Sequence, residues 1–317
     1  MRVWQAAMAG LAAAVITAAV EARAEPDAGV RARSFEVLLR RLDHYVFPEK
    51  TPAIRARLEA NRAAYLSQVD TASFIKAINA DLLAASGDRH LHLFLHDGRP
   101  PSADRKDGDY GIGRVERLPG GAGLIEVTGF SGDPASVVAV DAAVDRLRGS
   151  RALLIDLRRN GSGGQAAMHR LLGHLFPERV ELNGIAWRTC DNAPGSRPDA
   201  CRQGPRRIKR VFTDPPANPT FPTQPVYVLT SKDTFSAAEA VAYELQIRGR
   251  AKVIGETTGG GGNPSAGMDL ESDIVVVMPI GVMHEVTPGP GWEGAGVKPD
   301  ISVPAADAQA AALRAIG

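Results

Sequence analysis

The chain combines segments with the apolar spacing of helices and short apolar runs typical of buried strands. From residue 30 to 83, apolar side chains recur every three or four positions, which predicts a group of helices. Near residues 86–93 the period changes toward that of a strand. Further strands are predicted at 111–117, 122–128, 152–157, 252–254 and 273–278, with helices at 137–147 and 168–175. This alternation favours an α/β core preceded by a small helical module.

One junction between a predicted strand and a predicted helix stands out, in the segment Gln224–Gly249. Residues 226–229 are apolar and β-prone, and residues 230–234 form a polar turn. Ser236 then starts a helical pattern, so it would lie beside unpaired helix N–H groups and the positive end of the helix dipole, which can stabilise an oxyanion. On these residues alone, an ordinary helix cap, a common use of serine, is the favoured interpretation.

Two glycine-rich turns accompany this junction. The strand predicted at 152–157 runs into residues 156–164, DLRRNGSGG, and then into a helix, which repeats the layout around Ser236. The loop at 257–262 follows another strand but lacks the Gly-Lys-Ser/Thr ending of a phosphate-binding loop, so nucleotide binding is not supported. Glycines there are expected to allow close approach of the backbone to an extended ligand.

Composition limits the classes of function. With 317 residues, 44% of them hydrophobic, the chain can form one large domain or two smaller ones with a proper core. A formal net charge of +1 gives no electrostatic case for nucleic acid or an anionic membrane as a partner. The basic run at residues 202–210 has no interleaved aromatic side chains, and we expect it to be a solvated loop.

The first 24 residues have the pattern of a secretory signal peptide. Arg2 supplies a positive charge, residues 6–20 are mostly small and apolar, and Ala22-Arg23-Ala24 fits a cleavage site. The apolar run is shorter than the ~20 residues of a typical membrane-spanning helix. We therefore expect cleavage after Ala24, no integral membrane segment in the mature chain, and a periplasmic or extracellular location.

The two cysteines lie close together in a polar loop. In an oxidising compartment, Cys190 and Cys201 are expected to form one disulfide that closes this loop. Binding of a metal there would need further ligands nearby, and the sequence has none, so no metal site is expected.

Four motifs follow one another along the chain: DLRRN at 156–160, TSKDTFSAAE at 230–239, GETTGGG at 255–261 and WEGAGVKPD at 292–300. Taken in this order, they resemble peptidase family S41, which contains the C-terminal processing proteases, the tricorn protease core and the modules of interphotoreceptor retinoid-binding protein. The resemblance extends from about residue 88 to residue 303.

The resemblance implies a ClpP/crotonase-like fold, in which a mixed β-sheet carries flanking helices. It also divides the chain into a signal peptide at 1–24, an N-terminal helical module at 25–98 and a peptidase core at 99–317. Residues 97–149 are too few to hold a PDZ domain besides their core elements. The branch of the family without a PDZ domain is therefore the closer match, and specificity for protein tails is not supported.

The resemblance also implies catalytic roles. Ser236 matches the nucleophile, and Glu293 matches the acidic residue that orients a histidine base. Tail-specific members use a lysine base, but residues 259–262 at the corresponding place contain none. His90, in an Asp-x-His pattern, matches the base of the tricorn-like branch; His92 is the alternative, because residues two apart share one face of a strand.

An oxyanion hole is implied as well. Its donors would be the backbone N–H of Ala237 and one from the glycine turn, at Gly161 or Gly163. Ser162 stands between them where the family usually has glycine. If that position needs a positive φ, the turn must differ locally from that of the family.

The resemblance thus implies a secreted or periplasmic serine peptidase that acts on peptides or proteins through an acyl-enzyme, without metal or cofactor. Two alternatives remain open. One is a non-catalytic module that binds a small apolar ligand, such as a retinoid or a fatty acid. The other is hydrolysis of a non-peptide ester or amide by the same residues.

Overall fold

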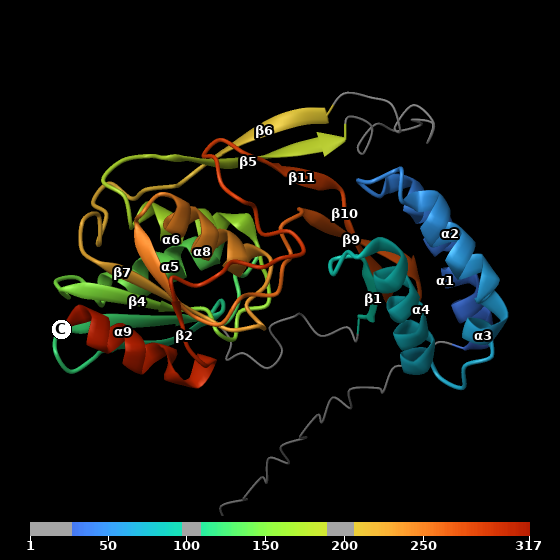
Figure 1. Cartoon of the computed structure of the whole chain (residues 1–317), viewed down its shortest axis with the longest axis horizontal. Coiled ribbons are helices and arrows are strands. Elements are labelled where there is room, and N and C mark those ends of the chain that lie inside the picture. Colours follow the sequence, from blue (N-terminus) through green and yellow to red (C-terminus); the bar gives the residue numbers. More distant parts are fainter. Residues whose placement is uncertain (1–26, 97–108, 189–205) are drawn as a thin grey trace, which may run out of the picture.

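Two lobes and a connecting group of strands make up the part of the chain that the structure describes. The structure is a computed structural model, and it describes residues 27–96, 109–188 and 206–317. Figure 1 shows a sheet flanked by helices on one side, a helical lobe on the other, and a strand arch above them. The predicted signal peptide at 1–24 and the predicted disulfide Cys190–Cys201 lie outside the described residues.

The larger lobe is built on a six-stranded sheet. Its strands are β2 (Ile112–Arg117), β3 (Ala122–Val127), β4 (Ala152–Asp156), β7 (Val226–Thr230), β8 (Ala251–Gly255) and β12 (Ile301–Ser302). They follow the order β12-β8-β7-β4-β3-β2, and every pair is parallel except β2 with β3. The sheet is therefore mixed, which confirms the predicted fold class.

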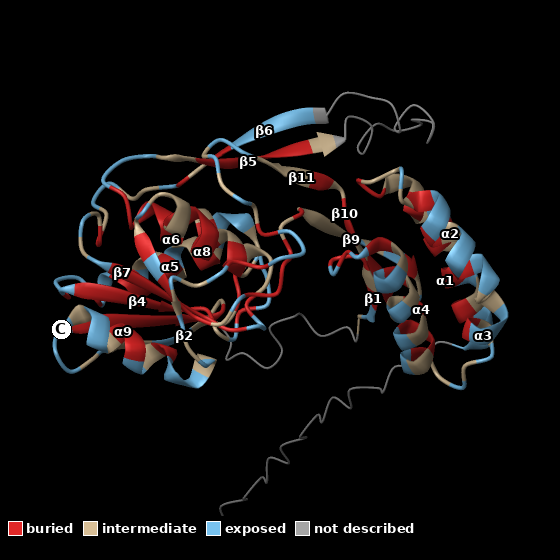
Figure 2. Cartoon of the chain, in the orientation of Figure 1, coloured by how far each residue is buried: buried red, intermediate tan, exposed pale blue. Residues whose placement is uncertain are grey.

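Helices cover both faces of this sheet. One face carries α5 (Ala135–Asp145), α6 (Gln165–Gly173) and α8 (Ala237–Ile247); the other carries α9 (Ala308–Ile316), which follows a short 3-10 turn, η2 (Ala305–Asp307). Strands β3, β4 and β7 are buried at every position, as expected for parallel strands covered on both sides (Figure 2). Along β4, Leu153 and Ile155 face one core while Leu154 faces the other.

The helical lobe is completed by strands from distant parts of the chain. Its helices are α1 (Ala28–Arg41), η1 (Leu42–His44), α2 (Thr51–Ala60), α3 (Arg62–Leu66) and α4 (Thr71–Ser86). They pack on an antiparallel sheet of order β1-β10-β9, formed by β1 (His92–Leu95), β9 (Ser265–Glu271) and β10 (Ile274–Pro279). Ile274, Val276 and Met278 enter the same core as Phe35 and Phe74. The helices thus share a core with late residues, and the division at residue 98 stays a prediction.

A third sheet forms the arch between the lobes. It contains β5 (Glu181–Arg188), β6 (Arg206–Phe212) and β11 (Gly281–His284), all antiparallel, in the order β11-β5-β6. Only Ile280 separates β11 from β10, so one continuous segment links the helical lobe to the arch (Figure 1). The two lobes are therefore tied together by backbone as well as by packing.

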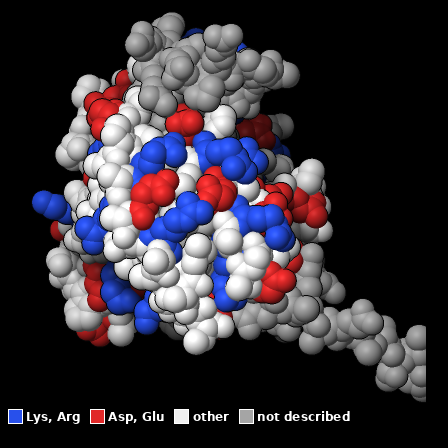
Figure 3. Space-filling model, turned by 90° about the vertical axis from the view of Figure 1, so that its right-hand side faces the viewer, with Lys and Arg blue, Asp and Glu red and all other residues white. Residues whose placement is uncertain are grey.

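The outer surface shows no sign of a charged docking face on the side of the helical lobe. Positive and negative side chains are interspersed over the described atoms there (Figure 3). Several helical residues form ion pairs, such as Arg57 with Asp81 at 2.6 Å and Arg55 with Asp43 at 3.3 Å. Within residues 27–96, 109–188 and 206–317, no helix is long and apolar enough to span a membrane, and no His, Cys, Asp and Glu side chains cluster as metal ligands.

Candidate active site

Ser236 lies where β7 gives way to α8, as the sequence predicts. It precedes the first residue of the helix and has φ 56° and ψ −117°, a conformation that is rare for a residue other than glycine. Its N–H donates to Oε2 of Glu239 at 2.8 Å. The serine is thus an N-cap by position, as the favoured local interpretation has it. The positive φ is the kind of local strain that is often found at functional sites.

The glycine turn after β4 is bonded directly to the turn that carries Ser236. Because β4 and β7 are neighbouring parallel strands, their carboxyl ends meet at the same edge of the sheet. The Phe235 N–H donates to the Asn160 carbonyl at 3.0 Å, and the Thr234 hydroxyl donates to the Leu157 carbonyl at 2.9 Å. The two similar junctions seen in the sequence therefore form one continuous loop surface.

Within the glycine turn, the position that needs glycine is 163 rather than 162. Ser162 is not among the residues with positive φ, whereas Gly163 has φ 152°. A Cβ on Gly163 would lie 2.2 Å from the carbonyl oxygen of Phe130, whose N–H and carbonyl bond to Ser162 and Gly164. The serine at 162 is therefore compatible with this turn without local rebuilding.

His90 lies in a turn between the helical lobe and β1. Helix α4 ends at Gly87, whose left-handed φ of 69° redirects the chain. Asp88 then accepts the His90 N–H at 2.9 Å and the Tyr45 hydroxyl at 2.8 Å. The ring of His90 packs on Phe235, with centroids 4.6 Å apart. Tertiary contacts on both sides thus fix the histidine.

Burial sets the ionisation of this histidine. His90 is only 5% exposed, and desolvation lowers its pKa from 6.5 to about 4, although the charge of Asp88 opposes the shift. Its Nδ1 is buried without a hydrogen-bond partner among the described residues. At neutral pH the imidazole is therefore uncharged and able to accept a proton.

The alternative base occupies a different place. Alternation predicts both histidines on one strand face, but β1 begins at His92, and His90 belongs to the turn before it. The Nδ1 of His92 lies 3.1 Å from the His90 carbonyl oxygen. His90 lines the cavity that holds Ser236, and His92 is not among the residues that line it.

Glu293 lies close to this region but contacts the glycine-rich loop. Its Oε2 accepts the N–H groups of Gly262 at 2.6 Å and Asn263 at 2.9 Å. Although the residue is exposed, partial desolvation and then the negative charge of Asp88 raise the pKa of its carboxyl. Among the described contacts there is none between this carboxylate and the imidazole of His90, so the orienting role of Glu293 stays a prediction.

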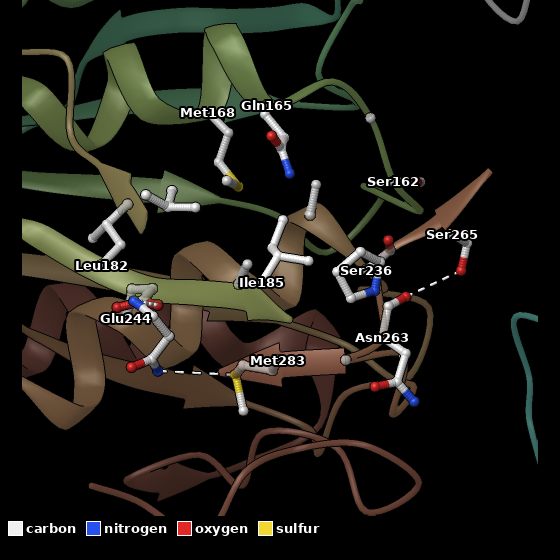
Figure 4. Close-up of a pocket in the computed structure, with 18 of the residues that line it drawn as sticks. Ser162, Gln165, Met168, Leu182, Ile185, Ser236, Glu244, Asn263, Ser265 and Met283 are labelled. Carbon is white, nitrogen blue, oxygen red and sulfur yellow. Dashed lines mark hydrogen bonds between the residues drawn. The ribbon is translucent and has the colours of Figure 1, made fainter. Parts of the chain in front are cut away.

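The cavity beside Ser236 has a volume of about 430 Å³ and is lined by residues of both lobes, such as Met168 of α6 and Val277 of β10. Figure 4 shows Gln165 and Met168 of α6 on one side of it, and Leu182 and Ile185 of β5 on the other. From α8, the small residues Ala237 and Ala240 and then Glu244 line the wall. Their spacing places them along one helix face. The volume is typical of a site for a small molecule or a peptide side chain.

The floor of the cavity is polar but paired. Glu244 is buried, its Oε1 accepts the Asn183 N–H at 2.9 Å, and its Oε2 pairs with Arg248.

Of the implied oxyanion donors, Ala237 and Gly163 line the cavity, and Gly161 is not among its lining residues. The cavity is thus lined by a serine at a helix N-terminus and by a neutral imidazole, two kinds of group that acyl transfer uses.

Sequence reasoning missed Phe235 and Asp88 as parts of the site. Both lie next to residues that it singled out, Phe235 inside the TFSAAE motif and Asp88 inside the Asp-x-His pattern. The motifs therefore contain the signal. Only the fold shows that the Phe235 ring packs on His90 and that Asp88 holds the backbone of this histidine.

Two family models and a curated relative match this sequence. A model of peptidase family S41 matches residues 121–303, and a model of the N-terminal domain of this family in eukaryotic IRBP matches residues 35–120. The carboxyl-terminal-processing peptidase 2 of Arabidopsis thaliana, a chloroplastic protein, is 27% identical over 205 residues, which are 60% of this chain and 35% of the relative. The chain thus spans about a third of that relative's length.

Solved structures show the same fold. A lipoprotein from Streptococcus agalactiae is similar with a TM-score of 0.62 and 15% identity, over 90% of this chain and 95% of that one. A candidate peptidase from Parabacteroides merdae is similar with a TM-score of 0.57 and 18% identity, over 86% and 90% of the two chains. At these identities the likeness concerns the fold alone.

Proposed function

The chain belongs to peptidase family S41, and on that premise we propose that it is a serine-type peptidase that hydrolyses peptide bonds through an acyl-enzyme on Ser236. One observation carries the proposal. Ser236, held at a positive φ at the start of α8, lines the same cavity as His90, which burial keeps neutral. A nucleophile and a base that share one cavity are the minimum that acyl transfer requires.

The reaction follows from these positions. The Ser236 oxygen attacks the substrate carbonyl while its proton passes to His90, and the N–H groups of Ala237 and Gly163 stabilise the resulting oxyanion. The C–N bond then breaks as the imidazolium returns the proton to the leaving amine. Water, deprotonated by the same imidazole, then attacks the ester carbonyl. The ester C–O bond breaks as the imidazolium returns this proton to the serine oxygen, which releases the acid and the free serine.

Burial of His90 favours the uptake of the serine proton but disfavours the imidazolium that this step produces. Its neutral form accepts the proton readily at pH 7, but the imidazolium that follows is disfavoured by the same desolvation. A nearby carboxylate would stabilise it, and we assign that role to Glu293. The negative charge of Asp88, which already raises the pKa of His90 against the desolvation, acts in the same sense.

The proposed peptidase would act on a peptide or a protein outside the cytoplasm. The relative from Arabidopsis is described as a carboxyl-terminal-processing peptidase, which supports a peptide substrate. Export of this chain rests on the composition of its first 24 residues. We also retain the division into a helical module at 25–98 and a peptidase core at 99–317 as part of the proposal.

The test compares three single variants with the wild-type protein on a mixture of unstructured peptides. Ser236→Ala and His90→Ala should each lower kcat by at least about 10³-fold, because either change removes a part of the nucleophilic unit. His92→Ala is the matched control and should retain activity. Unchanged hydrolysis by Ser236→Ala or His90→Ala removes that residue from the mechanism, and loss in His92→Ala alone makes His92 the base.

A second candidate is a binding module for a small apolar ligand. The cavity favours it in one respect, since Met168, Leu182 and Ile185 present apolar side chains beside Ser236. A fluorophosphonate probe separates the two candidates, because it reacts with an activated serine and not with an ordinary one. Labelling of the wild type at Ser236 supports the peptidase; binding of a fluorescent fatty acid without any labelling supports the module.

A further inference from the structure

Glu239 is a buried carboxylate three residues after the proposed nucleophile. It is 0% exposed, and no lysine or arginine in the described ranges forms an ion pair with it. Four hydrogen bonds take the place of a counter-charge. The donors are the Ser236 N–H at 2.8 Å, the Thr258 hydroxyl at 2.5 Å, the Gly260 N–H at 2.6 Å and the Gly261 N–H at 2.7 Å.

These hydrogen bonds match the ionised form of the carboxyl group. Three of the donors are backbone N–H groups, which cannot accept a proton. The hydroxyl of Thr258 accepts the Val297 N–H at 2.7 Å and donates its own proton to Glu239 at 2.5 Å. Desolvation raises the pKa of Glu239, and these donors oppose the shift. Each carboxylate oxygen of Glu239 accepts two hydrogen bonds, so both oxygens act as acceptors.

The four donors belong to two chain segments, the turn that carries Ser236 and the glycine-rich loop at 257–262. One is the backbone of Ser236 itself, in its positive φ conformation. The others belong to the glycine-rich loop, and this loop supports the base: a Cβ on Gly261 would lie 2.6 Å from Cε1 of His90. The indole N–H of Trp292 holds the same loop by donating to the Gly261 carbonyl at 3.1 Å.

We infer that Glu239 is a positioning residue for the proposed reaction: its carboxylate holds Ser236 in the strained conformation and holds the glycine-rich loop against His90. This side chain touches neither substrate nor reacting atoms, and together with the contacts of Asp88 and Phe235 it sets how the hydroxyl and the imidazole lie relative to one another. The inference rests on the proposed function. A misplacement of about 1 Å between reacting groups can cost ~10²-fold in rate, so the effect should fall on kcat.

The test is Glu239→Gln, which keeps the size of the side chain. Whichever way the amide is oriented, its NH₂ group faces at least one backbone N–H, which is left without an acceptor: that of Gly260 in one orientation, those of Ser236 and Gly261 in the other. We expect kcat to fall about 10- to 100-fold, with a parallel fall in the rate of fluorophosphonate labelling at Ser236. KM should stay within about threefold, because the walls formed by Met168 and Leu182 are unchanged.

Glu126→Gln is the matched control. Like Glu239, Glu126 is buried, with 6% of its surface exposed, and it accepts hydrogen bonds from Arg159 in the sheet lobe. It is not among the residues that line the cavity. Its replacement should lower the thermal midpoint without changing kcat. A merely structural role of Glu239 would give the same result for both variants.

If circular dichroism shows that Glu239→Gln does not fold, Thr258→Val tests the inference in its place. This variant removes one of the four donors to the Glu239 carboxylate. A lower kcat at unchanged KM supports the inference. Unchanged kcat and labelling in folded Glu239→Gln, or in Thr258→Val where the first variant does not fold, overturn it. A wild-type protein that is never labelled at Ser236 overturns the proposed function itself, which distinguishes the two failures.

Discussion

The ring of Phe235 packs against the imidazole of His90, with centroids 4.6 Å apart and planes inclined by 44°, and Phe235 is the residue before Ser236. The residue that precedes Ser236 thus forms part of the packing surface of His90. The glycine-rich loop makes room for this ring, since a Cβ at Gly259 or Gly261 would lie 2.6 or 2.4 Å from it. Two segments about 145 positions apart in the chain are thereby held in one arrangement.

Replacing Phe235 with alanine should therefore impair catalysis as well as stability. The change leaves the imidazole without one wall, and we expect kcat to fall by about 10-fold or more. The free energy of unfolding should fall by about 1–3 kcal/mol, less than for a fully buried phenylalanine, because Phe235 is only half-buried. Phe235→Leu restores part of the wall and should recover part of kcat; equal kcat in all three proteins would contradict the expected role.

The glycine turn offers a matched pair of substitutions. Gly163→Ala should lower the free energy of unfolding by more than about 1 kcal/mol, because Gly163 has φ 152° and its new Cβ would meet the Phe130 backbone at 2.2 Å. It should also lower kcat, since the turn carries a proposed oxyanion donor. Gly161→Ala should change neither, because a Cβ there meets nothing within 4 Å. Chemical denaturation and peptide hydrolysis measure both effects.

An opposite result would reassign the donor. If Gly161→Ala loses activity at unchanged stability while Gly163→Ala keeps it, the oxyanion donor is the N–H at position 161. Both variants retain every backbone N–H, so any difference reflects the shape of the turn.

Stability should depend on pH through His90. Burial lowers the pKa of His90 from 6.5 to about 4, so between these values the unfolded chain binds a proton that the folded chain does not. Stability is therefore fully present above pH 6.5 and falls as the pH falls toward 4, by up to about 3 kcal/mol for this group. Thermal unfolding of wild type and His90→Gln between pH 4 and 7 measures the difference. The burial of His169 lowers its pKa to about 4 as well, so the variant should keep part of the slope.

The same histidine should set the acid limb of activity. Because the free protein keeps His90 neutral down to a pKa of about 4, kcat/KM should remain high at pH 5.5 and decline only near pH 4. A limb centred near pH 6.5 would show that the group titrating in the active protein is a solvated histidine and not His90 as it lies in this fold.

The pattern of apolar residues predicts most strands of the sheet lobe. It does not predict the contacts between distant residues that form the site. Apolar runs such as 152–155 are typical of strands covered on both faces, and the sequence places this strand correctly. The packing of β10 on the N-terminal helices was not predictable in the same way, because β1 and β10 pair across about 180 residues and alternation does not specify a partner.

The same limit applies within the site. The sequence marks Ser236 and the glycines through their motif, yet it cannot tell which residue of the turn takes a positive φ. That requirement comes from the close approach of Phe130, which lies 33 residues earlier in the chain than Gly163. In the same way, alternation leaves His90 and His92 equivalent, and the cavity separates them because β1 begins at His92.

Glu293 can be assigned by comparing two substitutions that differ in charge and in hydrogen bonding. Glu293→Gln keeps an oxygen that can accept the N–H groups of Gly262 and Asn263 but removes the negative charge. If the charge stabilises the imidazolium of His90, kcat should fall by about 10-fold or more at unchanged thermal stability. Glu293→Ala removes both functions and should lower kcat at least as far, with a lower thermal midpoint. Wild-type kcat in Glu293→Gln together with loss in Glu293→Ala would mean that the carboxylate only holds the loop, and that the buried charge of Asp88 supports the base.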